Sequence, residues 1–282
     1  MVAGGLAFAA RWQQGNALVS RGQEARVVHL LADDAGMTVY IGCPDLLGGE
    51  DGRVVLADFY HEMLGWHRYD AYGTSFLSRS PKFRIGFDDD GWLDQRPPRW
   101  PDPEYPQQIH FDIAVQDLDA AGTRVTAAGG ALLQDNADHR VYADAAGHPL
   151  CLYPDPSGAA TEPTVAHLVY DCFSPRSLAR FYEGFVGVQE RLEDSPERVV
   201  IDLDDDDLPN LAFQHAQFPA PRWPDPAYPA QLHVDYRFTV DHEIPHFQTP
   251  AAKAAMARAE ELGAIHLQNA VYADPAGHPF CF

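Results

Sequence analysis

The spacing of apolar residues along the chain predicts two short amphipathic helices. Leu178, Phe181, Tyr182 and Phe185 follow one another at i, i+3, i+4 and i+7, which places them on one face of a helix. The stretch from Leu56 to Leu64 repeats this spacing and carries a Phe-Tyr pair at the same place. Each stretch is therefore expected to form a helix with one buried face.

Runs of β-branched and aromatic residues bounded by turn residues predict the strands. In chain order these runs are Thr38 to Cys43, Tyr69 to Leu77, Phe83 to Phe87, Gln108 to Val115, Val165 to Cys172, Val199 to Leu203, Leu211 to Gln214 and Gln231 to Val240. Ala-rich helices are expected at Leu118 to Ala128 and Ala251 to Leu262, each followed by a strand, a tight turn and a strand at 141–153 and 271–282. The order of strand, helix and strands thus occurs four times.

Two sequence blocks recur, and they show that the chain contains an internal duplication. PRWPDPEYPQQIHFD at 98–112 returns as PRWPDPAYPAQLHVD at 221–235, with eleven of fifteen positions identical. VYADAAGHPLC at 141–151 returns as VYADPAGHPFC at 271–281, with nine of eleven identical. We therefore expect two domains, at 37–157 and 163–282. Residues 1–36 lie outside the repeat, as an extension that is either flexible or upstream of a true start at Met37.

The amino-acid composition narrows the range of binding partners that can be expected for this chain. Asp and Glu number 41 against 20 Lys and Arg, for a formal net charge of −21. Such a polyanion repels phosphate backbones and anionic lipid, so nucleic acid and membrane surfaces are not expected partners. Apolar runs stay far below the ~18 residues of a membrane span, and the N-terminus lacks the positive start of a secretory signal. A cytoplasmic protein, either monomer or homodimer, is expected.

The four cysteines are too few for a disulfide scaffold in a chain of this length. Cys43 and Cys172 end the first strand of each copy, and Cys151 and Cys281 lie in its last strand. We interpret them as buried thiols that pack as small apolar residues.

The duplicated layout resembles the vicinal oxygen chelate superfamily, which includes glyoxalases, bleomycin-resistance proteins and dioxygenases. The resemblance rests on the FYxxxLGW-like helix end at 59–66, the IHFDIAVQDLDAA run at 109–121 and the DxxGHPxC turn. The two recurrent blocks look most like actinobacterial glyoxalase-like domains. The resemblance implies an α+β fold with tandem domains, each made of two βαβββ modules whose mixed sheets curl around a cleft.

Metal-dependent members of that superfamily place ligands on the first strand of each module and on later strands. The resemblance assigns these positions in the second copy to His167, His233, Cys281 and Gln214, with His215 beside the last. They could hold a divalent ion such as Zn, Fe, Ni or Mn, although the usual carboxylate is absent. The first copy offers only His110, because its other positions fall at Thr38, Cys151 and near Gly86 or Asp88.

A structural role is the alternative for these histidines. His110 and His233 each precede an Asp by two residues in a strand, so the imidazole and the carboxylate lie on the same face and could pair. His148 and His278 follow a Gly in a tight turn and are also interpreted as structural.

Three functions remain open. The first is a small-molecule binding protein of the glyoxalase-like type, which as an enzyme would be a metal-assisted lyase, isomerase or dioxygenase. The second is ligand sequestration without chemistry, as in antibiotic resistance, which the charge of −21 favours for cationic drugs. The third is a scaffold with a degenerate site. Catalytic motifs of other classes, such as GxSxG, a P-loop or a dinucleotide fingerprint, are absent from the sequence.

Overall fold

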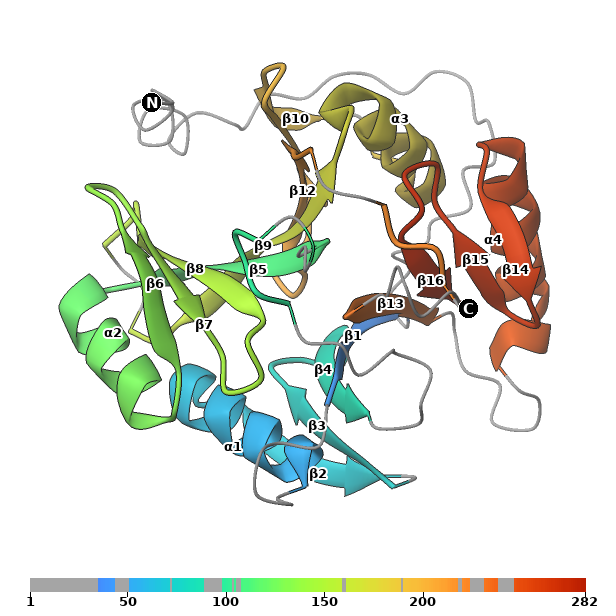
Figure 1. Cartoon of the computed structure of the whole chain (residues 1–282). Helices are drawn as coiled ribbons and strands as arrows, with labels where there is room; N and C mark the ends of the chain where they lie inside the picture. The colour runs from blue at the N-terminus through green and yellow to red at the C-terminus, as the bar shows by residue number, and fades with distance from the viewer. Residues whose placement is uncertain are drawn as a thin grey trace.

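A computed structural model describes most of the chain (Figure 1). The residues described are 35–43, 51–71, 73–88, 98–102, 104, 108–158, 161–188, 190–217, 220–223, 231–237 and 246–282. Residues 1–34 of the expected N-terminal extension, and the expected end of the strand at 238–240, lie outside this part. None of the described helices is long and apolar enough to cross a membrane.

The first copy contains two βαβββ modules, as expected. Module 1 comprises β1 (Gly36–Gly42), α1 (Gly52–Leu64), β2 (His67–Ala71), β3 (Thr74–Ser78) and β4 (Phe83–Asp88). Module 2 comprises β5 (Ile109–Val115), α2 (Leu118–Ala127), β6 (Ala131–Asp135), β7 (Arg140–Ala143) and β8 (Pro149–Pro154).

The second copy repeats this order. Module 3 comprises β9 (Thr164–Cys172), α3 (Pro175–Val186), β10 (Arg191–Asp194), β11 (Arg198–Ile201) and β12 (Asn210–His215). Module 4 comprises β13 (Leu232–Arg237), the 3₁₀ turn η1 (His246–Gln248), α4 (Pro250–Glu261), β14 (Ile265–Gln268), β15 (Val271–Ala273) and β16 (Pro279–Cys281). The α+β class predicted from the sequence is confirmed.

The sheets join modules of different copies. One eight-stranded sheet has the order β14-β15-β16-β13-β1-β4-β3-β2, and the other has the order β10-β11-β12-β9-β5-β8-β7-β6. The junctions are antiparallel pairs, β1 with β13 and β5 with β9, and both lie near the middle of the molecule (Figure 1). We call them the 1/4 sheet and the 2/3 sheet. Each of the two sheets therefore contains one module from each copy.

The helices pack on one face of the sheets. Tyr60 of α1 lies against Phe87 and Phe111, and Tyr182 of α3 lies against Phe213. These rings belong to one large buried cluster that includes residues of all four modules. Because side chains alternate along a strand, the residues beside these rings point to the opposite face, which we call the polar face.

A buried hydrogen-bonded group ties the modules of one copy together. In the second copy, Asp274 Oδ2 accepts from Tyr182 Oη at 3.1 Å and lies 2.9 Å from His278 Nδ1. Asp274 Oδ1 accepts from the backbone N–H groups of Ala276 and His278. The first copy has the same Tyr–Asp–His bridge.

In that first copy the bridge consists of Tyr60, Asp144 and His148. Its Asp lies in the tight turn of the duplicated DxxGH block, while its Tyr belongs to the helix of the other module of the copy. The structural interpretation of His148 and His278 thus agrees with their hydrogen bonds.

We expect Asp274→Ala to lower the free energy of unfolding by about 3 kcal/mol, because it leaves several buried donors without an acceptor. Tyr182→Phe removes one hydrogen bond and should cost about 1 kcal/mol. Asp206→Ala, at an exposed aspartate, is the control and should change little. Urea denaturation measures all three, and equal effects of Asp274→Ala and Asp206→Ala would contradict the bridge.

Candidate functional site

A carboxylate at the junction of the two copies organises the polar face of the 2/3 sheet. Asp112 of β5 pairs in register with His167 of β9, and its side chain is almost fully buried. Its Oδ2 atom accepts from Arg198 Nη2 at 2.6 Å and lies 3.2 Å from His167 Nδ1. Asp112 comes from the first copy and both partners come from the second.

Arg198 is the counter-ion of this carboxylate. It lies on β11, where its Nη1 donates to Gln214 Oε1 of β12 at 3.0 Å, and its Nε is 3.6 Å from Glu193 Oε2. Burial alone would raise the pKa of Asp112, but the Arg198 guanidinium and His167 hold it well below its usual range. A buried charge paired in this way stays ionised across the physiological pH range.

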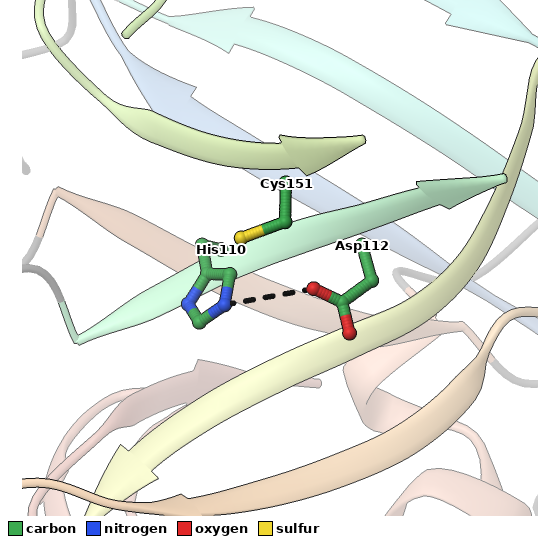
Figure 2. A group of neighbouring side chains, drawn as sticks. All are labelled: His110, Asp112 and Cys151. Atoms are coloured by element: carbon green, nitrogen blue, oxygen red, sulfur yellow. Dashed lines mark ion pairs between the residues drawn. The ribbon is translucent and has the colours of Figure 1, made fainter. Parts of the chain in front are cut away.

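His110 lies between two carboxylates on the same face. Its Nδ1 is 3.6 Å from Asp171 Oδ2 and its Nε2 is 3.7 Å from Asp112 Oδ1, and Figure 2 shows it beside Asp112 and Cys151. Burial would lower the pKa of His110, but the Asp171 carboxylate outweighs burial and holds that pKa well above its usual value. The two carboxylates therefore favour the imidazolium form of His110, whose side chain is buried.

A surface pocket adjoins this cluster. Its volume is about 260 Å³. Asp171 lines it together with Gln108, and apolar residues such as Phe173, Leu178 and Pro275 form much of its wall. The Asp171 carboxylate itself is buried beside the imidazole of His110, and Gln214 Nε2 also approaches it, at 3.5 Å from Oδ1. The pocket is large enough for a small molecule only.

The 1/4 sheet holds an equivalent cluster with different neighbours. His233, Asp235 and Cys281 bring ligand-type atoms within 4.8 Å of one another, as do His110, Asp112 and Cys151 in the 2/3 sheet. The ring of Tyr40 stacks on His233, with centroids 5.1 Å apart and planes 9° apart.

Tyr40 also lies over Gly86, where an added Cβ would come within 2.7 Å of its ring. An aromatic ring and a glycine thus stand on β1 and β4, at the counterparts of the strands that carry His167 and Gln214 in the 2/3 sheet.

The structure divides the residues predicted as one metal site between the two sheets. His167 and Gln214 lie on the 2/3 sheet, while His233 and Cys281 lie on the 1/4 sheet. These four residues do not share a sheet, because the strands pair between copies rather than within one, and their assignment as metal ligands stays a prediction. His110, predicted apart from them, shares its sheet with His167 and Gln214. His215 is exposed, and its Nδ1 lies 3.0 Å from the carbonyl oxygen of Phe173.

Three residues of the cluster were missed from the sequence as site residues: Asp112, Asp171 and Arg198. Arg198 immediately precedes the apolar run Val199 to Leu203. A charged residue at the first position of a buried strand was the sequence signal that could have identified it as a site residue. Asp171 is likewise a charged residue next to an apolar run, Leu168 to Tyr170 of the same strand.

The residues of the 2/3 sheet do not fit a divalent metal ion at the four superfamily positions. These positions fall at His110, Cys151, His167 and Gln214, but the Gln214 oxygen and the adjacent Asp112 carboxylate already bind the Arg198 guanidinium. A doubly charged ion about 5 Å from that guanidinium would meet a repulsion of roughly 7 kcal/mol at an effective dielectric constant of about 20. In the 1/4 sheet, Thr38 and Gly86 supply no usual ligand, and burial raises the pKa of the Cys281 thiol.

Two eight-stranded mixed sheets built from four βαβββ modules define a two-domain protein of the vicinal oxygen chelate superfamily. The model of the glyoxalase-like domain family matches residues 50–153 and 167–282. The chain belongs to this family, with two copies of its domain. The domain limits predicted from the sequence, 37–157 and 163–282, remain predictions.

Solved structures show the same fold at low sequence identity. Glyoxalase I from Zea mays is 16% identical, covers 87% of this chain and 91% of its own, and gives a TM-score of 0.54. A mutant of that enzyme is 15% identical, covers 90% of this chain and 94% of its own, and gives a TM-score of 0.55. Comparison with curated proteins gives no significant match.

We expect protein purified without chelator to contain less than one transition-metal ion per chain, because Arg198 already neutralises the carboxylate of the cluster. Elemental analysis of the purified protein measures this content. His110→Asn serves as the matched variant, since it would abolish a specific site but leave surface binding unchanged. One ion per chain that is lost in His110→Asn would contradict the assignment.

Proposed function

We propose that the protein binds a small molecule in the pocket beside the 2/3 sheet and moves a proton on it. The observation that carries this proposal is the buried cluster of His110, Asp112, Asp171 and Arg198, assembled from both copies and reaching the pocket through Asp171. Buried ionisable groups of this kind reduce stability unless each is paired, and they concentrate at functional sites. Family membership supports a small-molecule ligand.

Asp171 and His110 are assigned the roles of an acid–base pair. Asp171 is one of the residues that line the pocket, and we assign its carboxylate the role of accepting a proton from a carbon next to a carbonyl group of the ligand. The protonated His110 ring, on the far side of that carboxylate, stabilises its negative charge. Return of the proton to a neighbouring atom would complete an isomerisation, while loss of a leaving group would complete a lyase reaction. Both reactions need proton removal, and neither needs a redox-active metal.

Arg198 and Asp112 have a supporting role in this scheme. Their ion pair fixes the charge next to His110, and Gln214 is held by Arg198 Nη1 and approaches Asp171. The apolar wall of the pocket, which includes Phe173 and Leu178, would exclude water from the reacting carbon. A planar or compact organic molecule with a single carbonyl group suits this combination.

Deuterium exchange tests the proposal. We expect one or more members of a panel of small α-hydroxy and α-oxo carbonyl compounds to exchange carbon-bound hydrogen in D₂O in the presence of the protein, followed by proton NMR. Asp171→Asn should slow this exchange by about a hundredfold or more, since general acid–base catalysis contributes on the order of 10²–10⁴. His266→Asn, at an exposed histidine of β14, is the control and should exchange like the native protein.

The same panel of compounds, used in a melting-temperature measurement, distinguishes the proposed proton transfer from the second candidate function, which is ligand sequestration without chemistry. A compound that raises the melting temperature but shows no exchange would support ligand binding alone, since a ligand bound only to the native state stabilises it. Absence of both effects throughout the panel would reject a ligand of this chemical class. Equal exchange rates in Asp171→Asn and the native protein would reject the assigned base.

A further inference from the structure

Two arginines lie side by side on the polar face of the 1/4 sheet, away from the site described above. Arg84 of β4 pairs in register with Thr38 of β1, and Arg237 of β13 pairs with Gly36 of the same strand. Gly36 and Thr38 are two residues apart and so face the same side. The two arginines therefore flank β1 from opposite sides, on the face that carries Tyr40 and His233.

A glycine lets the two guanidinium groups approach each other. Arg237 Nη2 reaches across β1 to the carbonyl oxygens of Pro81 and Lys82, at 2.9 and 3.1 Å, just before the start of Arg84's strand. A Cβ atom at Gly36 would lie 2.8 Å from this nitrogen. Any other residue at Gly36 would push the guanidinium of Arg237 away.

The two positive charges are not balanced by a carboxylate within ion-pair distance in the described part of the chain. Other arginines, such as Arg140 and Arg191, each contact carboxylates. Burial, and then the charge of Arg84, lower the pKa of Arg237 to about 10, which still leaves it protonated at neutral pH. The Nε atoms of both arginines are buried, and no described residue forms a hydrogen bond with them.

One carboxylate, that of Asp235, acts on Arg237, but it does so more weakly than burial or Arg84. Its Oδ1 atom lies 3.3 Å from His233 Nε2. In a chain of net charge −21, two adjacent guanidinium groups that form no ion pair with a described carboxylate make a local region that attracts anions.

An aromatic row runs along the same face. Tyr69 and Phe76 stack with centroids 5.4 Å apart, Phe76 meets Tyr40 edge to face at 6.0 Å, and Tyr40 stacks on His233. Tyr69 and Tyr40 are only partly buried, and both influence the pKa of Arg237, which shows that this row lies close to the charges. Flat rings favour a flat ligand by stacking.

We propose that Arg84 and Arg237 form an anion site for a small aromatic carboxylate, whose ring lies on the row of Tyr69, Phe76 and Tyr40. A carboxylate accepts charge-assisted hydrogen bonds from guanidinium N–H groups, and the two adjacent positive charges favour an anion at this place. This site is separate from the pocket of the 2/3 sheet, so it goes beyond the proposed function and does not depend on it.

Calorimetric titration with sodium benzoate at constant ionic strength tests the proposal. We expect benzoate to bind the full chain. Benzamide, its neutral counterpart, and acetate, which lacks the ring, should bind at least tenfold more weakly. Arg84→Gln should weaken benzoate binding at least tenfold, and Arg79→Gln, at an exposed arginine of the same module, should not.

Two further measurements show whether the Arg84→Gln variant is folded and whether benzoate binds at the arginine pair or in the pocket of the 2/3 sheet. Because the side chain of Arg84 forms no hydrogen bond or ion pair with a described residue, Arg84→Gln should unfold at the same temperature as the native protein or slightly above it, since a like charge is removed. His110→Asn should bind benzoate like the native protein, which separates this site from the proposed pocket. Benzoate binding that Arg84→Gln leaves unchanged, or that benzamide equals, would overturn the proposal.

Discussion

The antiparallel pairing of first strands between the two copies is the constraint on which the rest of the structure depends. It joins β5 to β9 and β1 to β13, so that each eight-stranded sheet takes one module from each copy. The Tyr–Asp–His bridges instead connect the two modules of one copy, since each bridge joins a helix of one module to a turn of the other. Strand pairing between copies and hydrogen bonding within them together hold four modules around one core.

This pairing also explains why the two polar faces differ although the copies share their recurrent blocks. Modules 2 and 4 contribute the same His, Asp and Cys to the two sheets. The neighbouring module decides what surrounds them: module 3 supplies His167, Arg198 and Gln214, whereas module 1 supplies Tyr40, Arg84 and a glycine. Duplication thus preserved the framework. Differences between modules 1 and 3, together with Arg237 of module 4, gave one face a buried cluster of ionisable groups and the other a pair of arginines.

The sequence predicted what local patterns determine. Helices α1 and α3 carry apolar residues at helical spacing, and the duplicated blocks located both halves of the fold. The edge strands β6, β10 and β14 were not predicted, because their residues are largely exposed and show no apolar alternation.

The choice of partner strand could not be predicted either, since β5 and β13 share the same His-x-Asp pattern and pairing depends on contacts distant along the chain. For that reason His167 and His233 were assigned to one site although they lie on different sheets, and the role of Arg198 was missed.

The coupling between Asp112 and Arg198 tests the central claim, that one site is assembled from both copies, most directly. Unfolding free energies of Asp112→Asn, Arg198→Gln and the double variant form a double-mutant cycle, with Asp112 and Arg140 as the control pair. The account predicts a coupling energy of about 2 kcal/mol for Asp112 with Arg198, as for residues in direct contact, and additive effects for the control pair. Additivity within about 0.5 kcal/mol for Asp112 and Arg198 would contradict it.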